Sequence, residues 1–167
     1  MSFLVINKSP SNSIITPFNE GDVQPNAVDI RLERVLKVQP DVFELSEESK
    51  KHRSSVELKA EDGFWTIPPG VYDVLFDARV IIASGECGWV IPRSTLLRNG
   101  VTVNSGLYDS GYAGVVGAMM EVRVSDMRVT VNARVGQFIL TQAATQSMYS
   151  GDYGSGKRME QQLYGVQ

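Results

Sequence analysis

The chain has 167 residues, of which 43% are hydrophobic and 21% are charged, and its formal net charge at pH 7 is −3. This length and composition are typical of one globular domain with a core of its own. The weakly acidic balance predicts no attraction to nucleic acid or acidic lipid, so an anionic ligand would need a local cluster of positive groups.

Cysteine and histidine each occur once, as Cys87 and His52. The counts exclude an internal disulfide and a cysteine-rich zinc site, and a catalytic triad would need residues from several subunits. No segment reaches the run of about 18 apolar residues that spans a membrane. The start, MSFLVINKSP, is not typical of a signal peptide. We therefore expect a cytoplasmic protein without a membrane partner.

Short apolar or alternating segments follow one another along most of the chain. The first, VDIRLERVLKV (28–38), places Val28, Ile30 and Leu32 on one face and charged residues on the other. Similar segments, separated by turn residues, cover 72–83, 87–91, 100–104, 114–124, 127–133 and 137–143. Strands at this spacing, without a long helical pattern, predict an all-β fold, an antiparallel sandwich or barrel.

Helical character is confined to two short segments. Ser94–Asn99 predicts one or two turns after Pro92, and the charged segment 45–53 is equally compatible with a helix and a solvated loop. The end of the chain is rich in Gly, Ser, Gln and Tyr, so we expect it to be mobile and to join no core. The predicted organisation is a β-domain over residues 1–149 and a flexible C-terminal arm over residues 150–167.

Four polar segments interrupt the strands, and the first is PRSTLLRNG (92–100). It contains two hydroxyl side chains between two arginines: Arg93, Ser94, Thr95 and Arg98. If Pro92 opens a helix, the free N–H groups of the first turn, the hydroxyls and Arg93 form an anion-binding corner. The alternative is a plain helix cap with two solvent-facing arginines.

The other three polar segments are equally ambiguous on their own. In GLYDSGYAG (106–114), Asp109 is either a turn residue of a surface hairpin or an acid held close to a ligand. In RVGQFIL (134–140), Gln137 starts an apolar strand after a turn glycine. In the tail, residues 154–157 (GSGK) can wrap phosphates through N–H groups, a hydroxyl and an ammonium. They lack the spacing of a Walker A loop, and a solvated terminus is the alternative.

Taken together and in this order, these segments resemble the motifs of the dUTPase and dCTP deaminase superfamily. QPNAVDIRL (24–32) is similar to the first motif of the deaminases, and PRSTLLRNG to the second motif of both branches. GLYDSGYAG is most similar to the third motif of dUTPases, and GQFIL resembles the fourth motif. The tail resembles the fifth motif, with GDYGSG similar to dUTPases and GKRMEQQ similar to deaminases.

This resemblance implies a distorted jelly-roll, or β-clip barrel, that assembles as a homotrimer. In that family each active site takes residues from more than one subunit, and the C-terminal arm closes over the nucleotide. dUTPases hydrolyse dUTP to dUMP and pyrophosphate, whereas dCTP deaminases remove the 4-amino group of cytosine.

The resemblance favours the first of these two reactions. Deaminases carry a proton-shuttling Glu ten residues after the third-motif Asp, and that position is Met119 here, whose thioether cannot shuttle a proton. Glu121 lies about 7 Å further along the strand unless a β-bulge intervenes. We therefore expect a dUTP diphosphatase. A dCTP deaminase, alone or bifunctional, is the alternative, and a nucleotide-binding trimer without turnover is a third hypothesis.

The resemblance also implies roles for single residues. Asp109 is expected to activate the attacking water, and Tyr112 to pack against the deoxyribose. The remaining expected substrate contacts are Arg93, Ser94, Thr95, Arg98 and Gln137 at the phosphates, Asn104 at the uracil edge, Tyr153 on the base, and Ser155, Lys157 and Gln161 from the arm. The expected cofactor is Mg²⁺, held mainly by triphosphate oxygens and water, with Asp29 holding one of those waters.

Overall fold

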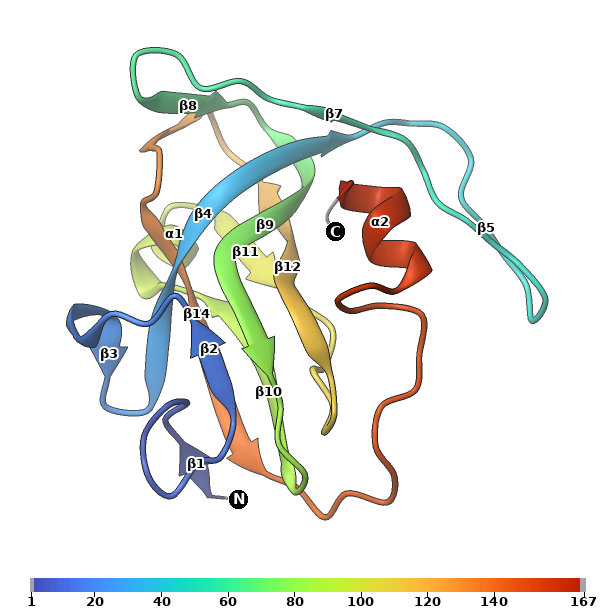
Figure 1. Ribbon diagram of the computed structural model, residues 1–167. Coiled ribbons are helices and arrows are strands. Elements are labelled where there is room, and N and C mark those ends of the chain that lie inside the picture. Colours follow the sequence, from blue (N-terminus) through green and yellow to red (C-terminus); the bar gives the residue numbers. More distant parts are fainter. Residues whose placement is uncertain (1, 166–167) are drawn as a thin grey trace.

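The computed structural model describes residues 2–165, which form a strongly curled, mostly antiparallel β structure (Figure 1). The strands of the main sheet are β1 (Phe3–Leu4), β2 (Ile14–Thr16), β3 (Val23–Gln24), β4 (Ala27–Val38), β7 (Ser55–Glu57), β9 (Gly70–Ile81), β10 (Glu86–Pro92), β11 (Val101–Asn104), β12 (Ala113–Val122) and β14 (Arg134–Gln142). Their order is β1-β14-β4-β9-β12-β11, with β10 on β14, β2 on β9, and β3 and β7 on β4.

Short strand pairs and helices complete the fold. Two short antiparallel pairs are formed by β5 (Glu44–Leu45) with β6 (Lys50–Lys51) and by β8 (Phe64–Ile67) with β13 (Met127–Thr130). The helices are the 3-10 turn η1 (Glu20–Asp22), α1 (Ser94–Arg98) and α2 (Arg158–Tyr164). Within the described residues, no helix has the length and apolar character needed to cross a membrane.

The curl of the sheet follows from its two longest strands and their irregular pairing. β4 and β9 have 12 residues each, and the register shifts in the pairings of β4 with β9, β4 with β14 and β9 with β12. Such irregularities bend a strand and increase its local twist. The prediction of an all-β antiparallel fold is therefore confirmed, and all seven predicted strand segments overlap observed strands.

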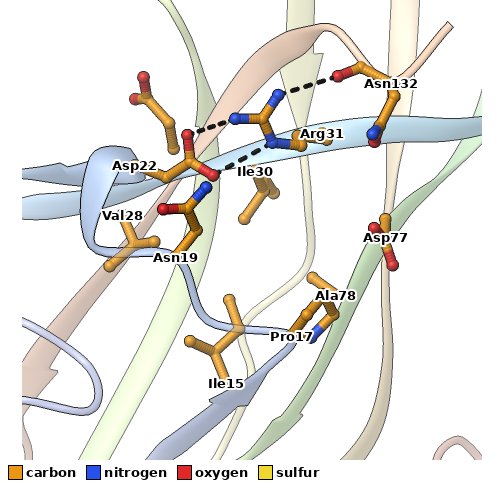
Figure 2. A pocket seen from close by; sticks show the side chains of 11 residues that line it. Ile15, Pro17, Asn19, Asp22, Val28, Ile30, Arg31, Asp77, Ala78 and Asn132 are labelled. Atoms are coloured by element: carbon orange, nitrogen blue, oxygen red, sulfur yellow. Dashed lines mark hydrogen bonds and ion pairs between the residues drawn. The ribbon is translucent and has the colours of Figure 1, made fainter.

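An ion pair fastens the N-terminal loop to the long strand β4. The Asp22 carboxylate, almost fully buried, accepts hydrogen bonds from Arg31 Nη2 at 2.6 Å and from Arg31 Nε at 3.1 Å. Figure 2 shows this pair beside a small cavity of about 150 Å³ that Pro17 and Ala78 also line. Because arginine pairs with both carboxylate oxygens, the loop has a fixed place against β4.

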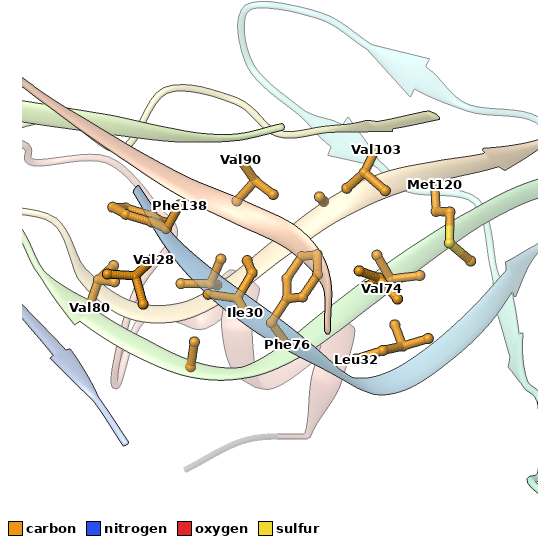
Figure 3. Packing of buried hydrophobic residues seen from close by; sticks show 14 of the residues in the cluster. Val28, Ile30, Leu32, Val74, Phe76, Val80, Val90, Val103, Met120 and Phe138 are labelled. Carbon is orange, nitrogen blue, oxygen red and sulfur yellow. The ribbon is translucent and has the colours of Figure 1, made fainter. Parts of the chain in front are cut away.

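The core lies inside the curled sheet. Leu32 of β4 and Val74 and Phe76 of β9 have no exposed surface, and Val90 and Phe138 lie on the opposite wall (Figure 3). Burying each such side chain contributes about 1.5–3 kcal/mol of transfer free energy. Because side chains alternate along the first half of β4, Asp29 and Arg31 point to the face opposite this core.

The structure decides two open points of local structure and corrects one expectation. Of the two alternatives for segment 45–53, the helix is not formed, and the segment carries the β5–β6 pair at the end of an extension that follows β4 (Figure 1). The predicted helical turn after Pro92 is confirmed as α1, although Pro92 itself ends β10. The tail contains α2, in which Met159 and Glu160 are buried, so it does join the packed part of the chain. Its few apolar residues suffice because Tyr164 covers Leu36, Leu75 and Val115 on the outer face of the sheet.

Candidate functional site

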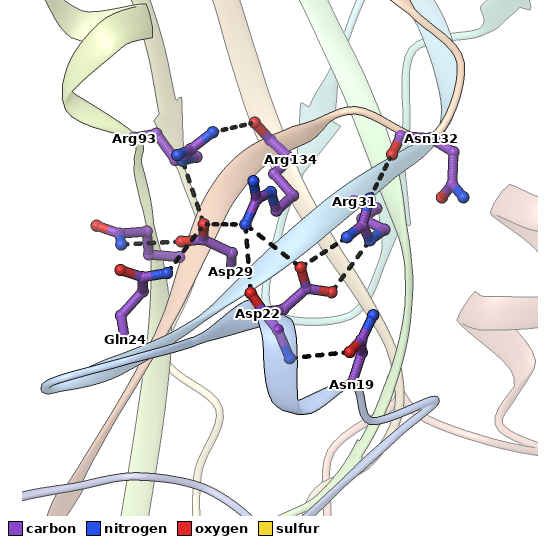
Figure 4. Close-up of polar contacts among 10 residues, drawn as sticks. Asn19, Asp22, Gln24, Asp29, Arg31, Arg93, Asn132 and Arg134 are labelled. Carbon is purple, nitrogen blue, oxygen red and sulfur yellow. Dashed lines mark hydrogen bonds and ion pairs between the residues drawn. The ribbon is translucent and has the colours of Figure 1, made fainter.

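The first polar cluster surrounds Asp29, whose side chain is completely buried. Gln137 Nε2 donates to Asp29 Oδ1 at 3.0 Å, and Gln24 Nε2 lies 3.5 Å from Oδ2. The guanidinium groups of Arg93 and Arg134 approach Oδ2 to 3.3 and 3.7 Å (Figure 4). A buried carboxylate needs such partners. Here they also fix the direction in which Arg93 points.

Strand pairing explains why these residues meet. β14 lies between β4 and β10, and its Gln137 is directly opposite Asp29 on one side and Ile91 on the other. The neighbouring Gly136 is tightly enclosed, because a Cβ there would lie about 3.1 Å from side-chain carbons of Ile30 and Val90 and would require them to shift. The structure thus brings together the predicted residues Asp29, Arg93 and Gln137 from three separate segments.

Arg93 lies at a polar corner that is open to solvent. Its side chain is 36% exposed, and Ser94 and Thr95 follow it as the exposed first turn of α1. A guanidinium and two hydroxyls at the start of a helical turn suit a phosphate. Arg98 lies at the other end of α1 and lines a separate cleft with Asp126, so the structure does not place it with Arg93.

Asp109 lies elsewhere, in an exposed loop between β11 and β12. It lines a cavity of about 510 Å³ with Cys87 and the start of the C-terminal segment. The Tyr108 backbone pairs with Gly88, and the Ser110 hydroxyl donates to the Glu86 carbonyl at 2.6 Å. These bonds hold the loop at the beginning of β10. Burial and the charge of Asp109 raise the pKa of the Cys87 thiol.

Within one chain, Asp109 lies far from Arg93. Asp109 shares its cavity with Cys87, near the start of β10, and Arg93 directly follows the end of that strand. Six residues of extended strand separate Cys87 from Arg93, which corresponds to about 20 Å. A single phosphate group cannot contact both side chains of the same chain.

An aromatic pocket of about 400 Å³ lies between the sheet and the C-terminal segment. Five of its lining residues are tyrosines: Tyr108, Tyr112, Tyr149, Tyr153 and Tyr164. Tyr112 packs edge-on against Tyr108 and Tyr149, with ring centroids 5.1 and 5.6 Å apart, and burial raises its pKa. Asn104, Tyr112 and Tyr153 therefore share one pocket, which suits a flat ring.

The pocket also contains a carboxyl group that the sequence analysis missed. Asp73 of β9 is directly opposite Met119 of β12, and both line the pocket. Burial raises the pKa of Asp73 to about 6, although a hydrogen bond from the Tyr164 hydroxyl at 3.4 Å and the charge of Arg34 act in the opposite direction. The only sequence signal was a charged residue on the outer face of a strand, which is a common feature.

Asp73→Asn is expected to stabilise the chain at neutral pH and to have little effect at acid pH. The pKa of Asp73 is about 6 in the folded chain and 3.8 for an ordinary aspartate. The ionisation of Asp73 therefore does not reduce the free energy of unfolding below pH 4, but it lowers this free energy by up to about 3 kcal/mol as the pH rises through 6. Urea unfolding at pH 4 and at pH 7.5 tests this, and an equal effect of the substitution at both pH values would contradict it.

The arm residues are distributed over the outside of α2 and the segment before it. Arg79 Nη1 donates to the Ser155 hydroxyl at 3.3 Å, whereas Lys157 and Gln161 are exposed and do not line the aromatic pocket. Glu160 is buried, and one of its oxygens accepts the Val115 N–H at 2.9 Å. The arm therefore docks on its own chain through Glu160 while Lys157 and Gln161 face outward.

Glu121 does not lie in the aromatic pocket. Its carboxylate binds the Arg123 guanidinium at 2.9 Å, and it is paired across the sheet with Val71 and Thr102. The register of β12 is regular from Gly117 to Val122, and its one shift, between Val115 and Gly117, precedes both Met119 and Glu121, so it does not bring Glu121 to the place of Met119. Among the residues that line the pocket, Asp73 is the carboxyl group beside that position.

The protein offers few ligands for a cation. Within residues 2–165 there is no group of three or more His, Cys, Asp or Glu side chains able to hold a metal ion. Both oxygens of Asp29 already contact amide or guanidinium groups. Asp29 is therefore a poor direct ligand, and a Mg²⁺ ion would depend on oxygens of the substrate and water.

Sequence comparison places the chain among nucleotide-processing enzymes. The dCTP deaminase-like family matches residues 6–143. A probable deoxyuridine 5'-triphosphate nucleotidohydrolase of Halobacterium salinarum is 30% identical over 144 residues, which cover 83% of this chain and 87% of that protein. The deoxyuridine 5'-triphosphate nucleotidohydrolase of Methanocaldococcus jannaschii is 26% identical, with 90% of this chain and 98% of that protein covered.

Solved structures share the fold. A 2'-deoxycytidine 5'-triphosphate deaminase from Agrobacterium tumefaciens superposes with a TM-score of 0.58 at 16% identity, over 77% of this chain. This chain spans 41% of the length of that deaminase. The dUTPase from phage phi11 of S. aureus superposes with a TM-score of 0.51 at 13% identity, over 86% of this chain and 98% of the phage protein.

Proposed function

This chain belongs to the dCTP deaminase-like family, and from that premise we propose that it hydrolyses dUTP to dUMP and pyrophosphate. The similar archaeal proteins from Halobacterium and Methanocaldococcus are both named as dUTP nucleotidohydrolases. The observation that carries the choice of reaction is the pair Asp109 and Met119. The acid is exposed in its loop, whereas the strand position for a proton shuttle at the base holds a thioether.

Asp109 is proposed to act as the general base. A carboxylate oxygen accepts a proton from water, the water oxygen bonds to the α-phosphorus, and the bond from that phosphorus to the bridging oxygen breaks. Pyrophosphate leaves with the electron pair of this bond. A carboxylate is a weak base toward water, so most of the acceleration must come from holding the water in line with the bond that breaks.

Arg93, Ser94, Thr95 and Gln137 are proposed to hold the phosphates. Asp29 orients the Arg93 guanidinium, so we assign it this positioning role in preference to holding a magnesium-bound water. Because Arg93 and Asp109 lie about 20 Å apart within one chain, the Arg93 that works with a given Asp109 would come from a second copy. A homotrimer with shared sites, built from distorted jelly-roll subunits, meets that requirement.

The aromatic pocket is proposed to take the base and sugar. Asn104 would contact the uracil edge, Tyr153 the face of the base, and Tyr112 the deoxyribose. The outward-facing Lys157 and Gln161, with Ser155, would serve phosphates of a neighbouring copy, and Arg98 has the weakest support because it lies in another cleft. Mg²⁺ would arrive with the triphosphate and neutralise part of its charge. A free nucleotide substrate accords with the predicted cytoplasmic location.

Product analysis tests the proposed reaction. The protein is incubated with Mg²⁺ and either dUTP or dCTP, and the products are separated by anion-exchange chromatography. The proposal predicts dUMP and pyrophosphate from dUTP, and neither ammonia nor a uracil nucleotide from dCTP. Tight dUTP binding without pyrophosphate would favour a nucleotide-binding trimer without turnover.

Deamination of dCTP is the second candidate, because the Agrobacterium deaminase shares the fold. Glu121→Gln is expected to leave the rate of either reaction unchanged, since Glu121 binds Arg123 outside the pocket. The measurement is ammonia and pyrophosphate release by the wild-type and variant proteins. Ammonia release that disappears in Glu121→Gln would show that the pocket is arranged differently during catalysis.

A further inference from the structure

We propose that Asp73 contacts the group at position 4 of the pyrimidine and that its protonation state sets the preference between dUTP and dCTP. In its neutral form the carboxyl donates to the 4-oxo group of uracil. In its ionised form it accepts a hydrogen bond from the 4-amino group of cytosine. This inference rests on the proposed function, because it needs a pyrimidine nucleotide in the aromatic pocket.

The floor of the pocket has the width of one pyrimidine. Asn104 of β11 is directly opposite Met119 of β12, which is directly opposite Asp73 of β9. Directly opposed residues point to the same face of a sheet with Cβ atoms about 5 Å apart, so Asn104 and Asp73 are separated by about 10 Å. Two hydrogen bonds of about 2.8 Å leave space for a single six-membered ring lying over the Met119 side chain.

Neighbouring cavities indicate which end of the ring faces Asp73. The cavity of Asp109 and the aromatic pocket share Leu107 and Tyr149 as lining residues. At its other end the pocket adjoins a cavity of about 260 Å³, and Asp73 lines both. A nucleotide with its α-phosphate near Asp109 therefore directs its glycosidic nitrogen toward the end of the pocket that adjoins the Asp109 cavity. The opposite ring atom, C4, faces the row that contains Asp73.

Hydrogen-bond chemistry supplies the selectivity. An ionised carboxylate only accepts hydrogen bonds, whereas a neutral carboxyl also donates one. The 4-oxo group of uracil only accepts, so it can pair with the neutral carboxyl alone, whereas the 4-amino group of cytosine donates and can pair with either form. A carboxylate that faces the 4-oxo group leaves two buried acceptors unsatisfied, so ionisation of Asp73 lowers the affinity for dUTP and not that for dCTP.

Several titratable and charged groups surround Asp73 and influence its protonation state. Tyr164 of α2 donates to it, and Arg34 of β4 lowers its pKa. Tyr108 and Tyr153 face it across the pocket and stay neutral near pH 7, because burial raises the pKa of both. In the adjoining cavity it meets His52 and Arg53. His52 is a second ionisable side chain next to Asp73 in that cavity, so the test must separate the two residues.

Calorimetric titration of dUTP and dCTP, with Mg²⁺, at pH 5 and pH 7 tests the proposal. The protein carries Asp109→Asn so that dUTP stays intact, alone or with Asp73→Asn, His52→Gln or Asp77→Asn added. With a pKa of about 6, the neutral fraction of Asp73 falls from about nine-tenths to about one-tenth over this range. Both nucleotides carry the same triphosphate, so its protonation changes both affinities by the same factor and has no effect on their ratio.

The preference for dUTP is expected to fall about 10-fold between pH 5 and pH 7, in line with the neutral fraction of Asp73. The fall should vanish with Asp73→Asn and persist with His52→Gln and Asp77→Asn. Asp77 is a matched control because it lies on the same strand as Asp73 but lines a different cavity. A ratio that does not change with pH, or a change that depends on His52 and not Asp73, would overturn the inference alone. Failure to bind either nucleotide would overturn the proposed function as well.

Discussion

Asp109→Asn is expected to lower kcat for dUTP by about three orders of magnitude, within the range that general-base catalysis contributes. The amide has the size of the carboxylate but cannot take a proton from water. Asp109 is exposed in its loop, so the exchange creates no buried unsatisfied group. Affinity for dUTP and the free energy of unfolding should therefore stay close to those of the wild-type protein.

Pyrophosphate release at saturating dUTP measures this effect, with calorimetry for binding and urea unfolding for stability. Asp62→Asn is a matched control, since Asp62 is another exposed turn aspartate, and its left-handed backbone (φ 49°) accepts asparagine. The control should retain full activity. Retention of kcat by Asp109→Asn would show that another group activates the water.

Arg93→Ala is expected to raise KM for dUTP by about 100-fold or more, because it removes two or more charge-assisted hydrogen bonds to phosphate. It also removes one partner of the fully buried Asp29 carboxylate, so the free energy of unfolding should fall by about 1–3 kcal/mol. Arg93→Lys should recover only part of the affinity, because an ammonium cannot pair with two oxygens in the same fork.

The matched control is Arg31→Ala. Arg31 and Arg93 are both about one-third exposed and both pair with a buried aspartate, Asp22 in one case and Asp29 in the other. Arg31→Ala should lower stability to a similar extent and leave KM for dUTP unchanged. Equal effects of the two substitutions on KM would mean that Arg93 has a structural role only.

The strands were predictable because their signal is local. Alternation along residues 28–38 and six further apolar segments places the strands, and glycine and proline mark the turns between them. The helix α2 was not predictable from the same signal. Met159 and Tyr164 are too few to form an apolar stripe, and Tyr164 finds its packing surface in Leu36, Leu75 and Val115, which come from distant strands.

The two polar sites differ in how far the sequence determines them. Motif order identified Asp29, Arg93 and Gln137, and strand pairing brings them together. Asp73 carries no motif, and its raised pKa depends on burial beneath the C-terminal segment. Its position opposite Met119 depends on the register of β9 and β12, which a single strand pattern does not specify.

Subunit mixing tests the central claim most directly, namely that dUTP is hydrolysed at sites where Asp109 and Arg93 come from different copies. Asp109→Asn and Arg93→Ala chains are co-expressed with different affinity tags, and assemblies that carry both tags are isolated. A cyclic trimer that contains both chains always has one of its three shared sites with both side chains intact. At a dUTP concentration well below the raised KM of Arg93→Ala, we therefore predict that mixed assemblies recover roughly a third of wild-type dUTP hydrolysis, whereas assemblies of either parent alone retain about 1% or less. Mixed assemblies no more active than their parents would contradict a shared site.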